Sequence, residues 1–213
     1  MIRMTAGRSP SSPADRPRPG LRERKKTKTR EAIRAATYAL VAEQGYDATT
    51  VEQIADRAEV SPSTVFRYFP TKEDIVLTGE HEPLLLEELR ARPADEPWMD
   101  SVRYVLGKAL ERSGREDPEA LRLRARLGVE VPAVRSRMFE SMSETGRLLG
   151  RAVADRTGRD PESLDVRVFA TSLVGALMEV SLYWAENDFA GDLGELVGRA
   201  LDVVEHGLPR EDH

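Results

Sequence analysis

Apolar residues recur along this chain with the period of about 3.6 residues that is typical of amphipathic α-helices. The strict alternation of a β-strand is not apparent in any stretch. The first apolar stripe consists of Ile33, Ala36, Leu40 and Val41. Gly45 follows the stripe, and glycine favours the positive-φ position at which many helices end. We therefore expect a first helix over residues 26–44.

Two further helix starts follow within a short distance. Thr50 precedes an apolar stripe that begins at Val51, and Gln53 completes the pattern of a capping box, in which two side chains satisfy each other's backbone N–H groups. Ser61 precedes Pro62, and proline fits the first helical position because it lacks the N–H that would be unpaired there. The sequence thus predicts a short second helix from Val51 and a third from Pro62.

The third predicted helix, PSTVFRY, has two chemically different sides. At about 100° per residue, Val65, Phe66 and Phe69 point to one side, and we expect Phe66 and Phe69 to anchor the helix on the first two. The other side carries the hydrogen-bonding side chains of Ser63, Thr64, Arg67 and Tyr68. Such a row suits the major groove of DNA, where arginine can bond guanine through two N–H groups.

A fourth helix is predicted directly after Pro70. Thr71 can cap it, which would place Lys72 and the first N–H groups of that helix where a phosphate could sit. Each DNA-contacting role has a plain structural alternative. For Arg67 this is a surface salt bridge, for Tyr68 a packed aromatic ring, and for Lys72 a solvated residue at a helix start.

The rest of the chain also has helical periodicity. Pro83 interrupts or bends the fourth helix, and a new stripe begins at Trp98. Asp-Pro pairs at residues 117–118 and 160–161 combine a cap with a first helical position, so we expect helices near Glu119 and Glu162. Residues 164–187 are apolar on nearly all sides, so that helix has to be covered on more than one side. Other stripes cover residues 134–149 and 193–204.

Length and composition exclude several classes of protein. The 213 residues suffice for one large domain or two small ones, and the absence of cysteine excludes disulfides and thiolate chemistry and fits the reducing cytoplasm. His81, His206 and His213 lie far apart, so we expect no metal site. A Gly-rich phosphate loop and a G-x-S-x-G motif are missing, which argues against an enzyme or a cofactor. No apolar run approaches the roughly 20 residues that cross a bilayer, so we expect no membrane partner.

The net charge of −5 conceals an asymmetry. Residues 1–78 hold 14 Lys and Arg against 10 Asp and Glu, which gives +4, and residues 79–213 hold 18 against 27, which gives −9. Within residues 1–30 only Asp15 and Glu23 oppose the basic side chains. These are Arg3, Arg8, Arg16, Arg18, Arg22, Arg24, Lys25, Lys26, Lys28 and Arg30. The low hydrophobicity of residues 1–21 predicts a disordered basic arm, either a solvated tail or a DNA-seeking extension.

The stretch TREAIRAATYALVAEQGYDATTVEQIADRAEVSPSTVFRYFPTKEDIV, residues 29–76, resembles the DNA-binding domain of TetR-family transcriptional regulators. The shared order is a long first helix ending in Gly-Tyr, then Thr-Thr, then Ile-Ala-x-x-Ala-x-Val-Ser, and then Thr-x-Phe-x-Tyr-Phe-x-x-Lys-Glu. One departure is Phe66, where the family often has tyrosine. Because phenylalanine lacks the hydroxyl that could touch a phosphate, we assign Phe66 a structural role.

The resemblance implies an all-α protein of about nine helices with two domains. A three-helix helix-turn-helix domain would occupy residues 22–76, and a larger helical domain for effector binding and dimerisation would occupy residues 77–207, followed by a tail at 208–213. By the same resemblance Thr50, Tyr68 and Lys72 hold phosphates of double-stranded DNA. The residues that face the bases are Ser63, Thr64 and Arg67.

The family's regulatory logic adds a pocket for a small hydrophobic effector in the second domain. Apolar candidates are Trp98, Val102, Met138, Met142, Phe169 and Tyr183, and His81 and Arg124 could fix polar groups of a ligand. A stripe of Met and aromatic residues at helical spacing is, however, more often core than pocket.

The resemblance also implies that the last two helices pair with their copies in a four-helix homodimer interface, rather than forming the core of a monomer. The residues expected there are Val166, Leu173, Leu177, Val180, Trp184, Leu196, Val197, Leu201 and Val204. A dimer would place two recognition helices about 34 Å apart, so the operator should be nearly palindromic. We expect a cytoplasmic repressor released by its effector, and the alternatives are a DNA-binding dimer controlled by a protein partner and an activator.

Overall fold

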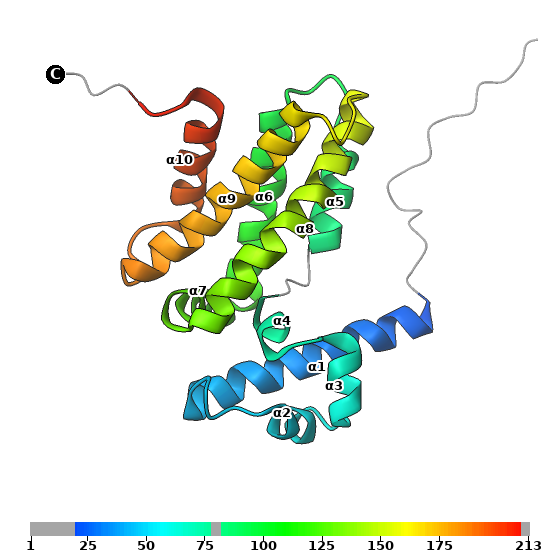
Figure 1. Ribbon diagram of the computed structural model, residues 1–213, viewed down its shortest axis with the longest axis vertical. Coiled ribbons are helices and arrows are strands. Elements are labelled where there is room, and N and C mark those ends of the chain that lie inside the picture. The colour runs from blue at the N-terminus through cyan, green and yellow to red at the C-terminus, as the bar shows by residue number, and fades with distance from the viewer. Residues whose placement is uncertain (1–19, 78–81, 210–213) are drawn as a thin grey trace, which may run out of the picture.

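The computed structural model describes residues 20–77 and 82–209, which form ten helices and no strand (Figure 1). The predicted all-α class is confirmed. The count exceeds the expected nine because the segment after Thr71 forms two helices, α4 (Lys72–Leu77) and α5 (Glu82–Arg90), on either side of residues 78–81. The predicted arm up to residue 19, His81, and residues 210–213 of the predicted tail lie outside the described residues.

The first three helices are α1 (Leu21–Gln44), α2 (Val51–Arg57) and α3 (Pro62–Tyr68). The Thr50 side chain accepts from the N–H of Gln53, whose own side chain accepts from the N–H of Thr50, so the predicted capping box is present. Gly45 ends α1 at a φ of 85°, as expected for a positive-φ glycine. The buried side chains of this domain include Ile33, Leu40, Ile54, Val65, Phe69 and Ile75.

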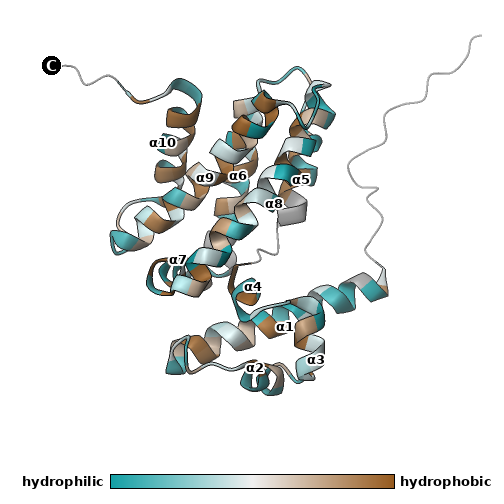
Figure 2. Cartoon of the chain, in the orientation of Figure 1, coloured by the Kyte–Doolittle hydropathy of each residue, from teal (hydrophilic) through white to brown (hydrophobic). Residues whose placement is uncertain are grey.

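Helix α1 begins at Leu21, five residues before the predicted start at Lys26. Its exposed N-terminal turns extend past α3 and are hydrophilic (Figures 1 and 2). The basic residues in this part are Arg22, Arg24, Lys25, Lys26, Lys28 and Arg30. The last part of the basic segment is therefore helical, and its charges have a fixed direction relative to α3.

The larger domain consists of α5, α6 (Trp98–Glu116), α7 (Pro118–Glu130), α8 (Pro132–Thr157), α9 (Leu164–Glu186) and α10 (Leu193–His206). Asp117 caps α7 and Asp192 caps α10, as predicted. The predicted helix start at Asp160-Pro161 is wrong. Asp160 accepts instead from the N–H of Glu162 across a turn, and α9 begins one turn later, after Ser163.

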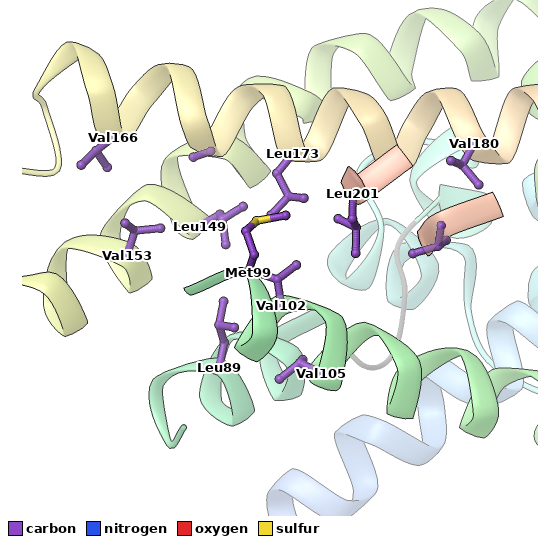
Figure 3. Close-up of a cluster of buried hydrophobic side chains, with 12 residues drawn as sticks. Leu89, Met99, Val102, Val105, Leu149, Val153, Val166, Leu173, Val180 and Leu201 are labelled. Atoms are coloured by element: carbon purple, nitrogen blue, oxygen red, sulfur yellow. The ribbon is translucent and has the colours of Figure 1, made fainter. Parts of the chain in front are cut away.

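The main core of this domain lies between α5, α6, α8, α9 and α10 (Figure 3). Side chains from all five helices meet there, among them Leu89, Val102, Leu149, Leu173 and Leu201. On α8, Gly150 lies against Val166 and Ala170 of α9, and a Cβ atom added there would make ordinary van der Waals contact with a methyl group of Val166 at 3.5 Å. The position of α9 is therefore fixed by contacts with α7, α8 and α10.

By length and composition alone, α9 could cross a membrane, with a mean hydropathy of 1.4 over its most apolar 18 residues. The sequence prediction that no apolar run reaches this length therefore needs correction. Only 28% of that stretch is buried inside the protein, although α9 packs against three other helices. An apolar helix in this position has a side that its own chain leaves uncovered.

The two domains share a small core. Val41 and Tyr46 of the first domain pack with Val76 of α4 and with Leu127 and Val134 of the second domain. This cluster therefore packs α1 and α4 of the first domain against α7 and α8 of the second.

Candidate nucleic-acid interface

The N-terminus of α3 is held by a small network of hydroxyl groups. The Ser61 Oγ accepts from the backbone N–H of Thr64 at 3.2 Å and lies 2.9 Å from the hydroxyls of both Ser63 and Thr64. Pro62 takes the first helical position, as predicted. The seven-residue helix is thus fixed at its start by side chains that also face outward, since Ser61 and Ser63 are exposed and Thr64 is half-buried.

Two side chains attach α3 to the domain. Val65 and Phe69 are each 1% exposed. On the α1 side of the Phe69 ring lie the guanidinium groups of Arg30 and Arg34, at 5.0 and 5.8 Å from its centroid. Arg34 is itself buried, and this burial lowers the pKa of its guanidinium. The position of α3 is therefore set by a narrow apolar edge and by α1.

The expected anchoring role of Phe66 is wrong. Its side chain is 51% exposed. On a helix of 3.6 residues per turn Phe66 lies about 60° from both Ser63 and Phe69, at the edge of the apolar side. In so short a helix α1 and α2 cover only the strip around Val65 and Phe69, so Phe66 falls on the solvent side with Ser63 and Arg67.

Arg67 is exposed and forms no ion pair within the described part of the chain. Its guanidinium carbon lies 5.4 Å from the centroid of the Tyr68 ring, which is half-buried against the core. The salt-bridge alternative for Arg67 is therefore excluded among these residues. The arrangement leaves all five guanidinium N–H donors available to an outside partner.

Lys72 has a different place from the one its sequence position suggests. Its ammonium donates to the backbone carbonyls of Tyr46 at 2.9 Å and Thr49 at 3.0 Å, and lies 3.9 Å from the centroid of the Tyr46 ring. The solvated alternative for Lys72 is therefore wrong. Two of its three donors tie α4 to the loop before α2, so at most one remains for a phosphate.

The N-terminus of α4 is capped, so one of the N–H groups expected to meet a phosphate is already bonded within the chain. Thr71 Oγ1 accepts from the Asp74 N–H at 3.1 Å, and Asp74 Oδ2 accepts from the N–H and the hydroxyl of Thr71 at 3.1 and 2.9 Å. The other carboxylate oxygen of Asp74 accepts from Arg137 Nε on α8 at 2.7 Å. The start of α4 is thus capped at the Asp74 N–H and linked to the second domain, and the pairing of Asp74 with Arg137 spans 63 positions with no signal in the sequence.

The residues expected in the dimer interface belong mostly to the protomer's own core. Six are buried within the chain: Val166, Leu173, Val180, Trp184, Val197 and Leu201. These six side chains already pack within the chain, so an interface on these two helices would use other side chains. Leu177 and Leu196 are half-buried against the main core, and Val204 lines a surface groove. The apolar residues that α9 and α10 do expose include Leu164, Val168, Tyr183 and Val203.

The residues expected in an effector pocket do not surround one cavity. Trp98, Val102 and Phe169 meet at the main core, where the Trp98 and Phe169 rings are 6.1 Å apart. Met138 and Met142 instead approach Gly128 of α7 and Gly175 of α9. Arg124 lies within electrostatic reach of Arg34 and Tyr38 of α1, and Tyr183 is 48% exposed.

Two hollows in the described residues are open surface grooves. One, of about 410 Å³, lies between α1 and the end of α2. The other, of about 480 Å³, lies between α9 and α10 and is lined by Leu164, Asp165, Val168, Phe169, Ser172 and Val204. Of the expected pocket residues, Phe169 alone lines either of these two grooves. Among the described residues no cluster of three or more His, Asp or Glu could hold a metal ion.

Comparison with known proteins agrees with this architecture. Residues 33–78 match the family described as bacterial regulatory proteins, tetR family, and residues 96–209, more than half of the chain, match the MftR C-terminal domain. The HTH-type transcriptional regulator TcmR of Streptomyces glaucescens is 35% identical over 149 residues, which are 67% of this chain and 66% of TcmR.

Solved structures extend the likeness over most of the chain. The crystal structure of Thermus thermophilus FadR, a TetR-family repressor in complex with lauroyl-CoA, has a TM-score of 0.54 and 26% identity, and covers 85% of this chain and 96% of that one. Bacillus subtilis FadR in complex with stearoyl-CoA has a TM-score of 0.56 at 23% identity, and covers 84% of this chain and 99% of that one.

Proposed function

Because the chain belongs to the TetR family of transcriptional regulators, we propose that it is a homodimeric repressor that binds a nearly palindromic operator through α3. The single observation that carries this proposal is the outward face of α3. There Arg67, with all its donors free, stands beside Ser63 on a helix fixed by Val65 and Phe69. A guanidinium held in this way can bond the N7 and O6 atoms of guanine in the major groove.

Phosphate contacts would position α3 in the groove. Thr50 is exposed at the N-terminus of α2, and its oxygen accepts from the Gln53 N–H, which leaves its hydroxyl proton for a phosphate. Tyr68 supplies a phenol beside Arg67, and Lys72 has one remaining donor. The exposed basic turns of α1 add charge that would release counterions from DNA beside the recognition helix. A repressor that acts through such contacts with DNA would be located in the cytoplasm.

We propose that the uncovered side of α9 and α10 forms the dimer interface. This side includes the 480 Å³ groove and the exposed side chains of Leu164 and Val168, which are 75% and 54% exposed. An apolar surface of this kind on a soluble protein marks a contact site. Pairing two copies there would bury the apolar side of α9 and direct both α3 helices toward one face of a duplex.

The effector proposed is a hydrophobic small molecule, with an acyl-CoA thioester as the first candidate. T. thermophilus FadR, of the same fold, is described in complex with lauroyl-CoA. In this chain the Nε1 atoms of both Trp98 and Trp184 are buried without a hydrogen-bond partner among the described residues, and Trp98 is the one on α6. A buried donor of this kind would be satisfied by a carbonyl of a ligand that enters beside α6.

One observation favours a second candidate, a DNA-binding dimer controlled by a protein partner. The expected pocket residues do not line a common cavity, and of these residues only Phe169 lines one of the two surface grooves described above. In that case a protein partner would bind the surface of the second domain and drive a conformational change from there. An activating role uses the same DNA contacts and would be recognised by the position of the operator relative to the promoter.

Titration of a protein–operator complex separates these candidates. The operator is first selected from a random pool, and its release is followed by fluorescence anisotropy while lauroyl-CoA, stearoyl-CoA or coenzyme A alone is added. We expect release by the acyl thioesters and not by coenzyme A. Because Trp98 and Trp184 are the two tryptophans, a Trp184→Phe variant would also report acyl-CoA binding through Trp98 fluorescence. Unchanged anisotropy and fluorescence with both thioesters would contradict acyl-CoA control and favour the second candidate.

A further inference from the structure

Phe66 is an exposed aromatic side chain that the folding of the domain does not use. Among the described residues from Gly20 to Leu77, the large apolar side chains that are exposed are Leu21, at the first position of α1, and Phe66. The core contacts of α3 are already made by Val65 and Phe69. The half of the side chain that lies in water adds no stability to the free protein and is available to a binding partner.

The position of Phe66 on α3 points to that role. Residues three apart on a helix are neighbours, with Cβ atoms about 5–6 Å apart, so Phe66 lies beside Ser63. Arg67 is its next neighbour along the chain, and all three side chains are exposed. Phe66 is therefore part of the surface that the proposed function brings into the major groove.

The chemistry of the ring limits what it can meet there. A phenyl ring has no donor or acceptor, and placing it against the amino, carbonyl or ring-nitrogen groups of a base would remove water from them without replacing its hydrogen bonds. Of the groups that base pairs present in the major groove, the C5-methyl group of thymine is the apolar one. We infer that Phe66 reads a thymine methyl group in each half-site, an inference that rests on the proposed DNA-binding function.

The same geometry restricts the position of this thymine. Phe66 and Arg67 are consecutive residues, so they leave the same turn of α3 about 100° apart around the helix axis. The thymine therefore lies in the same half-site as the guanine bonded by Arg67. Twofold symmetry of the dimer would repeat the pair in the second half-site.

Replacement of thymine by deoxyuridine tests the inference, because it removes the methyl group and leaves the base pairing unchanged. Each thymine of the selected operator is replaced in turn, and affinity is measured by anisotropy with the full-length protein. We expect one thymine per half-site at which the wild type binds about fourfold more weakly after replacement, the value expected for one methyl-sized apolar contact. The Phe66→Ala variant should bind the duplex with thymine at that position and the duplex with deoxyuridine there with equal affinity.

The Arg67→Ala variant is the matched control, since it should bind more weakly overall and keep the fourfold ratio at that thymine. Circular dichroism and the midpoint of thermal unfolding show whether Phe66→Ala is folded, which its exposure predicts. The inference is overturned if no deoxyuridine replacement weakens binding of the wild type. It is also overturned if Phe66→Ala still binds the deoxyuridine duplex about fourfold more weakly than the thymine duplex. These results leave the proposed function intact, because that function is tested separately by whether the wild type selects a symmetric operator.

Discussion

At the residue scale, the position of a side chain on a helical wheel predicted its direction but not its partners. The wheel correctly placed Arg67 on the outside and Val65 and Phe69 on the inside of α3. It placed Phe66 inside as well, because the wheel does not show how wide a strip the neighbouring helices cover. Lys72 was expected to reach outward, yet its ammonium bonds two carbonyls of a loop whose path periodicity cannot give.

Arg67 carries the sequence preference in this account. Arg67→Ala should reduce affinity for the selected operator by about 1–3 kcal/mol, because the variant loses a bidentate contact with guanine. Its affinity for random duplex should change little, since non-specific binding depends on phosphate contacts. Anisotropy titrations against both duplexes at the same salt concentration measure the difference. Equal losses on operator and random DNA would show that Arg67 contacts a phosphate.

The second test measures how much Lys72 contributes to the stability of the protein. Lys72→Ala should lower the free energy of unfolding in urea by about 1–3 kcal/mol, because two carbonyl groups lose a charged donor. Lys28, which is exposed on α1, is the matched control, and Lys28→Ala should stay within about 0.5 kcal/mol of the wild type. An unchanged stability of Lys72→Ala, together with a salt slope of DNA binding reduced by about one unit, would make phosphate binding, and not the contact with the loop, the main role of Lys72.

At the element scale, helix starts with a local chemical cause were predictable and the relations between helices were not. The caps at Thr50, Ser61, Asp117 and Asp192 depend on residues within one turn, and all four are present. Asp160 has the same local pattern but closes a turn instead. The apolar surface of α9 was evident from the sequence, whereas the division between core and uncovered side depends on where α8 and α10 pack.

The link between α4 and α8 is the element-scale feature with the clearest consequence. Arg137→Ala removes the ion pair with Asp74, a residue that is 8% exposed. The substitution should therefore loosen the contact between α4 and the second domain. We expect faster hydrogen exchange at α4 amides and a loss of about 1–2 kcal/mol in unfolding free energy, reduced from the value for a buried pair because Arg137 is partly exposed.

Arg135 on the same helix provides the control for this experiment. It faces Glu186 at 3.9 Å, and both side chains are 45% exposed, so Arg135→Ala should change stability by less than about 0.5 kcal/mol. Asp74→Ala combined with Arg137→Ala completes a double-mutant cycle. Additive losses in that cycle would show that the two side chains do not couple the domains.

At the scale of the whole molecule, charge and apolar surface are separated between the two domains. The basic turns of α1 and the outward face of α3 belong to the domain that is expected to meet DNA. The uncovered apolar side lies on α9 and α10, in the acidic part of the chain. This division suits a protein that contacts DNA with one domain and a second copy of itself with the other.

The proposed dimer face can be tested by a single charge. Val168→Glu should produce a monomer at micromolar concentration in sedimentation equilibrium, because a carboxylate would be buried without a partner in the interface. Ser143→Glu, on the exposed outer side of α8, should remain dimeric. A dimeric Val168→Glu protein with wild-type affinity would place the interface elsewhere.

The central claim is that two copies of α3, held by a dimer, read a symmetric DNA sequence. Selection of duplexes bound by the wild-type protein from a random pool, followed by sequencing, tests it most directly. The account predicts an inverted repeat with a guanine in each half-site and half-site centres about one helical turn apart, or a multiple of it. Recovery of unrelated sequences, or of a motif without twofold symmetry, would contradict it.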